Sequence, residues 1–473
     1  MANTGRIRHA VVLGGGLAGL LTAVVLTQYA QRVTVVERDR VPEGPQPRRG
    51  TPQARHAHLL MSSGAEAIEK LVPGFTRRLL DAGAHKVTVR TGVLSCTANG
   101  WLPREGDLQY IITVSRPLLD WTVRELVLAD ERITLLEDID ATGLTGDSGE
   151  ITGVTVRVRG GEGPDHPHTL DADFVVDATG RGSSAQSWLA ALGVPPVREE
   201  KVDTGLAYAT RVFQAPAGAA GFPVVNVTPD PGDPRPGQAG ALLPIEGGRW
   251  IVTLSGLKGS QPPTDEKEFM EFARRLRHPV IADLIAAAEP VGGIHQSRST
   301  VNRRRHYEEL PVWPAGFLVV GDAAGAFNPI YGHGMSVAAK TALSLRAALD
   351  RHGPHPARPQ VLQKAVAAAG QDAWSLAVAQ DLRYLPSYDA KAPKPAARLL
   401  RRYMARFNRA SASRLSVAAV AADLFTLSAP LSRVTAPKTV LGTLLGPARP
   451  PLTEPPLTER ERKALTEVTG VSY

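Results

Sequence analysis

The stretch from His9 to Leu26 reads HAVVLGGGLAGLLTAVVL, and it decides how the rest of the chain is interpreted. An apolar run comes first, three glycines follow, and a second apolar run begins after them. This order predicts a buried strand, a tight turn and a helix. Glycine suits Gly14 because the turn is tight, Gly16 because the backbone there approaches a ligand, and Gly19 because helix and strand pack closely.

A helix that begins at this turn directs its unpaired N–H groups forward, which suits a pyrophosphate. A second apolar strand over residues 32–36 leads into Glu37, where an acid that hydrogen-bonds an adenosine ribose is expected. Strand, turn, helix and acid together predict dinucleotide binding, whereas the glycines alone would also fit a flexible turn. The residues predicted to contact the dinucleotide at this turn are Gly14, Gly16, Leu17, Ala18 and Gly19.

Composition excludes several other classes of protein. The net charge of +8 would suit nucleic acid, but the arginines are dispersed and no nucleic-acid motif occurs, so we interpret the charge as an aid to solubility. A single cysteine, Cys96, excludes an intrachain disulfide and a multi-cysteine metal site, which fits the cytoplasm. We expect no signal peptide before the first strand and, since no uncharged apolar run reaches about 18 residues, no transmembrane segment.

The alternation of strand and helix patterns predicts an α/β chain in six segments. A Rossmann-like nucleotide-binding domain is expected to be interrupted by a mainly antiparallel substrate domain and followed by a helical C-terminal region. The nucleotide-binding segments are residues 1–85, 113–200 and 301–352, the substrate-domain segments are 86–112 and 201–300, and the C-terminal region is 353–473. Residues 57–71 are predicted to form a helix within the first segment.

Two further motifs follow apolar strands, DATG at residues 177–180 and GD at residues 321–322. Their order after the first glycine turn resembles that of single-component flavoprotein monooxygenases. Three longer stretches, residues 49–60, 115–124 and 327–336, resemble the bacterial flavin epoxidases of polyether-ionophore biosynthesis, such as the lasalocid and monensin epoxidases. The resemblance implies a glutathione-reductase-type FAD-binding domain.

The same resemblance implies the contacts of FAD. Glu37 is expected at the adenosine ribose, Arg116 at the diphosphate or ribityl chain, and Asp322 at a ribityl hydroxyl. An ordinary surface arginine and a helix cap are the alternatives for Arg116 and Asp322. Further cofactor contacts implied are Arg38, Arg49, Gly332, Gly334 and Met335.

The resemblance also implies the reaction, which is epoxidation of a polyene polyketide through a flavin C4a-hydroperoxide, with O2 as co-substrate. NADPH or a separate flavin reductase would supply the electrons, since no second glycine motif is present. No catalytic side chain is implied, and Pro329, Ile330 and Tyr331 are expected to form a wall beside the flavin. The candidate substrate-binding residues, which are equally compatible with structural roles, are Gln53, His56, Phe213, Phe222, Leu243 and Trp250.

Other interpretations stay open. Aromatic hydroxylation is the nearest, a prenyl-chain reductase shares the DATG segment, and a flavin-binding protein with a structural cofactor is the non-enzymatic alternative. A halogenase is disfavoured because its W-x-W-x-I-P motif is missing. We expect no metal, because His56 and His58 are two residues apart, on different sides of a helix, without a third ligand. The basic, amphipathic stretch 395–427 fits a membrane surface or, as we favour, a cap on its own protein.

Overall fold

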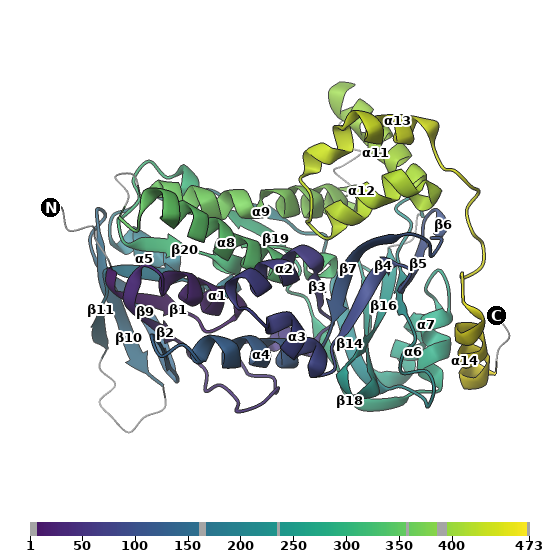
Figure 1. The fold of residues 1–473 in the computed structure, drawn as a ribbon, viewed down its shortest axis with the longest axis horizontal. Helices are drawn as coiled ribbons and strands as arrows, with labels where there is room; N and C mark the ends of the chain where they lie inside the picture. The colour runs from purple at the N-terminus through teal and green to yellow at the C-terminus, as the bar shows by residue number, and fades with distance from the viewer. Residues whose placement is uncertain (1–6, 160–166, 234–236, 356–358, 386–394, 471–473) are drawn as a thin grey trace.

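The computed structural model describes residues 7–159, 167–233, 237–355, 359–385 and 395–470 (Figure 1). At its centre is a parallel sheet in which five strands take the order β20-β12-β1-β2-β8. The strands are β1 (Ile7–Leu13), β2 (Ala30–Val36), β8 (Ile133–Leu136), β12 (Phe174–Asp177) and β20 (Phe317–Val319). Their apolar residues point to both faces, so both faces must be covered.

Helices cover one face of this sheet and a small antiparallel sheet covers the other. Val12 and Val176 lie in the core shared with the helices, whereas Val11 and Val175 lie in the core shared with the antiparallel strands. The helices are α1 (Leu17–Leu26), α2 (Ser62–Leu71), α3 (Phe75–Asp81), α4 (Arg116–Leu128) and α8 (Gly334–His352), and the strands are β9 (Ile139–Gly146), β10 (Ile151–Val158) and β11 (His168–Asp171). This three-layer arrangement confirms the Rossmann-like domain.

A second sheet of seven strands, ordered β18-β14-β17-β16-β15-β5-β6, lies beside the first domain (Figure 1). Neighbouring strands in this sheet run antiparallel, except for β15 and β5, which run parallel to each other. The strands are β5 (Val93–Thr97), β6 (Gly100–Trp101), β14 (Ala207–Gln214), β15 (Val224–Val227), β16 (Gln238–Ile245), β17 (Arg249–Gly256) and β18 (Glu289–Ser297). The prediction of a mainly antiparallel inserted sheet is confirmed.

The two faces of this second sheet have different surroundings. Phe213, Phe222 and Trp250 are at most 3% exposed, in a core shared with α6 (Glu266–Arg274) and α7 (Val280–Ala286). Because side chains alternate along a strand, Tyr208 on β14 points to the opposite face. Leu243 packs on that opposite face, against residues next to the first domain.

Two smaller sheets connect the domains. They are β3 (Leu59–Met61), β7 (Asp107–Thr113) and β4 (His85–Arg90) in one, and β13 (Glu199–Val202), β19 (Asn302–Arg305) and β21 (Gly325–Ala326) in the other. The helix predicted over 57–71 begins only at Ser62, because residues 59–61 pair with β7 instead. Tertiary pairing therefore overrides the local helical pattern there.

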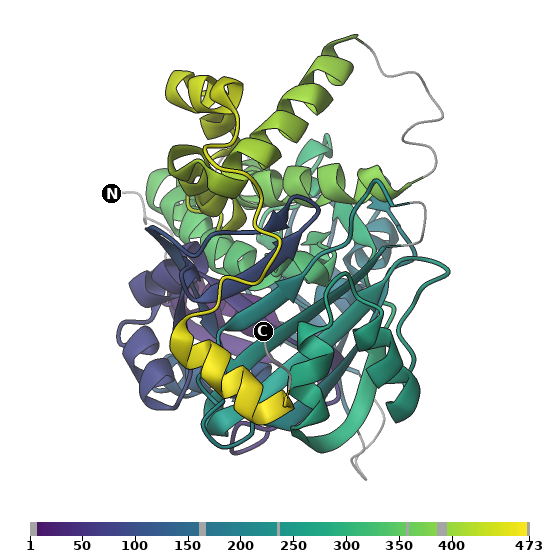
Figure 2. The same cartoon turned by 90° about the vertical axis from the view of Figure 1, so that its right-hand side faces the viewer.

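The C-terminal region is helical, as predicted. After α9 (Gln360–Asp381), the helices α11 (Pro395–Ser413), α12 (Leu415–Phe425) and α13 (Pro437–Leu445) form a lobe at one end of the molecule (Figure 1). The predicted stretch 395–427 is thus two helices, separated at Arg414. An extended segment then leads to α14 (Glu459–Thr469), which packs on α7 (Figure 2). No helix in the described ranges is both long and apolar enough to span a bilayer.

Candidate cofactor and substrate site

The glycine turn after β1 has one position that is open to a ligand. A Cβ on Gly14, whose φ is +101°, would lie 2.7 Å from the Ala178 carbonyl oxygen, and one on Gly19 would lie 1.9 Å from the Gly14 carbonyl oxygen. A Cβ on Gly16 would meet no atom within 4 Å. Gly14 and Gly19 are therefore required by the protein's own backbone, whereas the space at Gly16 fits the close approach of a pyrophosphate.

Glu37, which directly follows β2, is fixed to this turn. Its Oε2 accepts a hydrogen bond of 2.8 Å from the Gly15 N–H, and its Oε1 accepts one of 3.0 Å from the Asp39 N–H. Arg48 Nη1 lies 2.6 Å from Glu37 Oε2, and Arg48 Nη2 donates to the Gly15 carbonyl at 3.2 Å. Arg48 was not singled out from the sequence, whereas the predicted arginines 38 and 49 are exposed.

The DATG turn after β12 fixes a second arginine. The Asp177 carboxylate is fully buried and accepts hydrogen bonds from the Thr179 hydroxyl at 2.6 Å and the Ser183 hydroxyl at 2.5 Å. Burial raises the pKa of Asp177. Arg181 follows in the 3-10 helix η2 (Gly180–Gly182), donates to the Val301 carbonyl at 3.0 Å, and places Nε 3.6 Å from Asp322 Oδ2.

Asp322 lies in the 3-10 helix η5 (Gly321–Ala323), which follows β20. Like the ends of β1 and β12, this strand end is next to the glycine turn. Its side chain is 42% exposed, yet burial raises its pKa, against the influence of Arg181, then Arg116, then Arg303. Water therefore reaches this carboxylate, although the protein atoms near it are numerous enough to raise its pKa. Since Asp322 lies within η5 and not at its N-cap, the geometry fits a ligand hydroxyl better than a helix cap.

Arg116 is nine-tenths buried at the start of α4, so it is not an ordinary surface arginine. Its Nε donates to Asp120 Oδ1 at 2.7 Å, and its charge acts on both Asp322 and His58. Burial, and then the charge of Arg116, lower the pKa of His58 to about 3. The structure thus brings Arg116, His58 and Asp322 together.

His56 faces the substrate-domain sheet. Its Nδ1 lies 2.9 Å from the Thr210 hydroxyl, and its ring meets the Tyr208 ring edge-on at 4.5 Å. Burial, and then the charges of His295 and Arg55, lower its pKa to about 4. The nearby candidate Gln53 is exposed on the 3-10 helix η1 (Pro52–Arg55).

His56 and His58 follow η1 and are not on a helix, which corrects the argument made from their spacing. His58 instead uses Nδ1 to contact the His56 carbonyl oxygen at 2.8 Å. Among the described residues, one group has ligand atoms close enough for a metal ion, namely His306, Glu308 and Glu309. Its two carboxylates pair with Arg304 and Arg198, and we assign no metal there.

Tyr208 and Thr210 were missed from the sequence, although the alternation along β14 would have separated them from Phe213. The latter, with Phe222 and Trp250, belongs to the core beside α6 and α7, which is the structural alternative that the sequence left open. Leu243 is 2% exposed on the opposite face, packed with Leu59 and Val87. The face that meets His56 therefore carries Tyr208, Thr210 and Leu243.

A buried polar network fixes the predicted flavin wall. The carboxylate of Asp381, at the end of α9, accepts hydrogen bonds from the side chains of Asn302, Asn328 and Tyr331. Burial raises the pKa of Asp381. This network supports the 3-10 helix η6 (Pro329–Tyr331), of which Pro329 and Ile330 are exposed.

The residues that follow η6 lead into α8. Gly332 has a φ of +68°, and a Cβ there would lie 3.1 Å from Met61 Cε. Gly334, the first residue of α8, is exposed, and a Cβ on it would meet nothing within 4 Å, whereas Met335 is buried. The N–H groups at the start of α8 are thus next to open space, as an anionic ligand requires.

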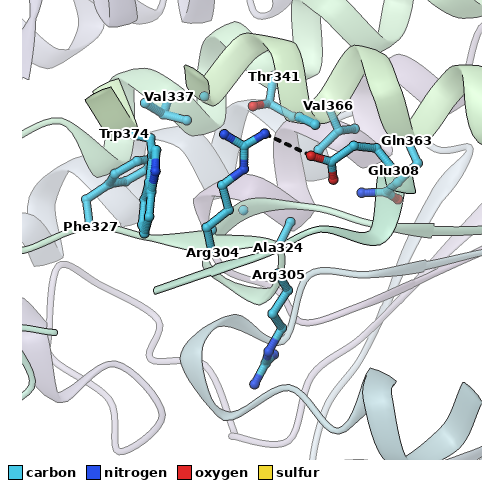
Figure 3. Close-up of a pocket in the computed structure, with 14 residues that line it drawn as sticks. Arg304, Arg305, Glu308, Ala324, Phe327, Val337, Thr341, Gln363, Val366 and Trp374 are labelled. Atoms are coloured by element: carbon cyan, nitrogen blue, oxygen red, sulfur yellow. Dashed lines mark hydrogen bonds and ion pairs between the residues drawn. The ribbon is translucent and has the colours of Figure 1, made fainter. Parts of the chain in front are cut away.

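Two hollows, one beside η5 and one at the opposite ends of the strands, do not compete with this site. The one in Figure 3 lies between α8, α9 and β19, has a volume of about 40 Å³, and contains the Arg304–Glu308 ion pair. The other, of about 630 Å³, lies at Phe174 and Phe317, the amino ends of β12 and β20. Ligands of open α/β sheets bind at the carboxyl ends, where Gly14, Asp177 and Asp322 follow their strands.

Comparisons with known proteins agree with this geometry. A family model described as an FAD binding domain matches residues 8–379. Protein Rv3254 of Mycobacterium tuberculosis is 33% identical over 356 residues, which cover 73% of this chain and 74% of that protein. Kynurenine 3-monooxygenase of Xanthomonas euvesicatoria is 25% identical over 386 residues, covering 73% and 72%. The structure of p-nitrophenol 4-monooxygenase from Pseudomonas putida, 18% identical, superposes with a TM-score of 0.62 over 89% of this chain and 98% of that one.

Proposed function

We propose that this chain, which belongs to the FAD-binding domain family of flavoprotein monooxygenases and has FAD as its cofactor, epoxidises the alkenes of a polyene polyketide in polyether natural-product biosynthesis. The motif resemblance suggests this substrate class. The observation that carries the proposal is the chemistry of the sheet face beside His56, on which Tyr208, Thr210 and Leu243 lie around a neutral imidazole.

An alkene needs no proton removed before it accepts an oxygen atom, so a wall without a charged base suits it. Asp381, the carboxylate nearest to η6 in the described network, is already held by three side chains. Asp322 faces Arg181. Neither carboxylate is placed to serve a substrate as a proton acceptor.

Bound FAD supplies the electron transfer and the oxygen chemistry, and the chain supplies binding and orientation. We assign Asp322 and Arg116 to the ribityl and diphosphate region, the open face of Gly16 to the pyrophosphate, and Glu37 with Arg48 to the adenosine end. The N–H groups of residues 332–335, at the start of α8, would stabilise negative charge on the reduced ring. The apolar side chains of Met61 and Leu243 would help exclude water from the reacting alkene.

Aromatic hydroxylation is a second candidate, and His56 is the observation that favours it. With a pKa of about 4, its imidazole is neutral at pH 7, so a ring nitrogen could accept a hydrogen bond from a phenol and orient it. The two named relatives, kynurenine 3-monooxygenase and p-nitrophenol 4-monooxygenase, are oxygenases of aromatic compounds by name. The two candidates therefore differ in whether turnover depends on His56.

The deciding experiment is aerobic turnover of the purified FAD-loaded protein with NADPH, with and without a flavin reductase, on linear polyene esters and phenols under labelled oxygen. Mass spectrometry that finds one labelled oxygen per modified alkene supports epoxidation. Label on an aromatic ring moves the assignment to hydroxylation, and a two-hydrogen gain without label indicates a reductase. No substrate-dependent oxygen uptake on any compound supports a structural flavin.

His56→Gln provides the matched control. Epoxidation is expected to survive this substitution, because no proton is taken from the alkene, whereas phenol hydroxylation is expected to fall by about two orders of magnitude or more. Thr210→Val removes the hydroxyl that contacts His56 while keeping the shape of the side chain. A loss of alkene turnover in His56→Gln, at unchanged FAD content, would contradict the alkene proposal.

A further inference from the structure

We propose that the C-terminal lobe, defined as residues 395–446, docks on the surface of an anionic membrane. The proposal is independent of the reaction, since it rests on the side chains that the lobe exposes. Five leucines of α11 and α13 are more than half exposed, namely Leu399, Leu400, Leu441, Leu444 and Leu445. In the rest of the described chain, only Val158, at 52%, is a large apolar side chain exposed to this degree.

The position of α11 explains why its leucines are uncovered. Phe407 and Ala410 in its second half are buried against α12. Leu400 is on the same helical stripe, two turns before Phe407, but is 57% exposed. Figure 2 shows the reason, since the first turns of α11 extend outward beyond the helices that cover its second half. The interpretation that we favoured from the sequence, a helix packed as a cap on its own protein, thus holds only for the second half of α11.

The lobe is strongly basic as well as apolar. Residues 395–446 contain eight arginines and lysines and a single acidic residue, Asp423. Arg406 and Arg414 are used within the lobe, where they donate to carbonyl groups at the end of α13, Arg406 to Thr443 at 3.0 Å and Arg414 to Gly446 at 2.6 Å. Other basic residues of the lobe that are exposed are Arg398, Arg402, Arg409, Arg433 and Lys438.

An anionic bilayer fits this surface better than a protein does. Protein interfaces are anchored by aromatic side chains in pockets, whereas these side chains are leucines on α11 and α13, and the first turns of α11 project outward. A second copy of the chain would bring the same positive charges together across a two-fold axis. Leucines that enter the boundary between headgroups and acyl chains, with arginines at the phosphates, are the pattern of interfacial helices.

The lobe is attached to the FAD domain at its other end. His333, just before α8, contacts the Phe425 carbonyl oxygen through Nε2 at 3.1 Å, and Lys340 Nζ donates to the Leu427 carbonyl at 2.6 Å. Both carbonyl groups are at the end of α12. Docking through the exposed leucines would therefore hold the FAD domain beside the bilayer.

The test is co-sedimentation of the full FAD-loaded chain with vesicles. We expect it to bind vesicles of equal parts phosphatidylglycerol and phosphatidylcholine, to bind pure phosphatidylcholine weakly, and to lose binding as salt is raised. Leu399→Ser with Leu400→Ser, and separately Leu444→Ser with Leu445→Ser, should each lower the partition coefficient by about tenfold. Arg398→Gln with Arg402→Gln should reduce binding to the anionic vesicles only.

Val158→Ser is the control, because it removes an apolar side chain that is also more than half exposed, on β10 at the other end of the molecule (Figure 1), and should leave binding unchanged. FAD content and circular dichroism must match the wild type for every variant, which separates a lost surface from a lost fold. Failure of the wild type to bind anionic vesicles would overturn the proposal. So would a stable dimer in gel filtration that the leucine substitutions dissociate, since the leucines would then be covered by a second copy.

Discussion

Arg48 Nη1 lies 2.6 Å from Glu37 Oε2, and this ion pair joins the proline-rich loop after β2 to the glycine turn after β1. The two side chains are 11% and 6% exposed, so the pair is shielded from water. The Gly15 N–H donates to the same carboxylate oxygen at 2.8 Å. One buried carboxylate thus sets the position of both the loop and the turn.

Replacing Arg48 with Met is expected to destabilise the protein, because it leaves the Glu37 charge buried without its partner. The cost of such a change is about 3–5 kcal/mol, and it should appear in urea unfolding of the FAD-free protein. FAD affinity should fall as well, because the turn loses a support. Arg49→Met, at the exposed neighbouring position, should leave the free energy of unfolding unchanged. Equal effects of the two substitutions would refute the structural role of Arg48.

Gly16→Ala and Gly19→Ala should separate cofactor binding from folding. Gly16 has a φ of −81° and open space around it, so alanine should leave the unfolding free energy of the FAD-free protein within about 0.5 kcal/mol. It should still weaken FAD binding, measured by flavin fluorescence. Gly19→Ala should prevent normal folding, because its Cβ would lie 1.9 Å from the Gly14 carbonyl oxygen. Full FAD affinity in Gly16→Ala would show that the open space is not the pyrophosphate site.

Asp322→Ala is expected to release FAD more readily than the wild type. The water-accessible carboxylate is lost and Arg181, 3.6 Å away, loses its partner. The measurement is the ratio of flavin to protein absorbance after exhaustive dialysis, with Glu37→Ala at the adenosine end as the companion variant. If both variants kept full FAD occupancy, the assignment of these two carboxylates would fail.

The stability of the protein should fall on mild acidification, partly because of His56. Its pKa is lowered from 6.5 to about 4, so between these values the unfolded chain binds a proton that the folded chain does not. The contribution of His56 is complete above pH 6.5 and is lost as the pH falls toward 4, with a penalty of about 2 kcal/mol at pH 5. Urea unfolding at pH 7 and pH 5 should show a smaller difference for His56→Gln than for the wild type or for the exposed-site control His168→Gln.

The two faces of the second sheet should respond differently to substitution. Trp250→Ala opens a cavity in the core beside α6 and α7 and should cost about 3–5 kcal/mol of stability. Tyr208→Phe keeps the volume on the opposite face and should instead change turnover or substrate preference at nearly constant melting temperature. Steady-state kinetics and thermal unfolding of both variants decide this. A purely structural effect of Tyr208→Phe would place the substrate elsewhere.

Local patterns in the sequence were sufficient to predict the layers of the fold. The glycine turn and the strand that leads into Glu37 follow from residues adjacent in the chain. The start of α2 did not, because residues 59–61 pair with β7, some 50 residues away in the sequence. The predicted domain boundaries and FAD contacts remain predictions.

By itself the sequence determined the strand–turn–helix unit and the order of the motifs, because these depend on periodicity and on the conformations that glycine allows. Only the tertiary structure decided that Arg48 meets Glu37, and that Tyr208 and not Phe213 faces His56. Which arginine of a loop, or which face of a strand, points toward the site depends on what packs against it. That selection depends on contacts between residues far apart in the chain, which local patterns do not contain.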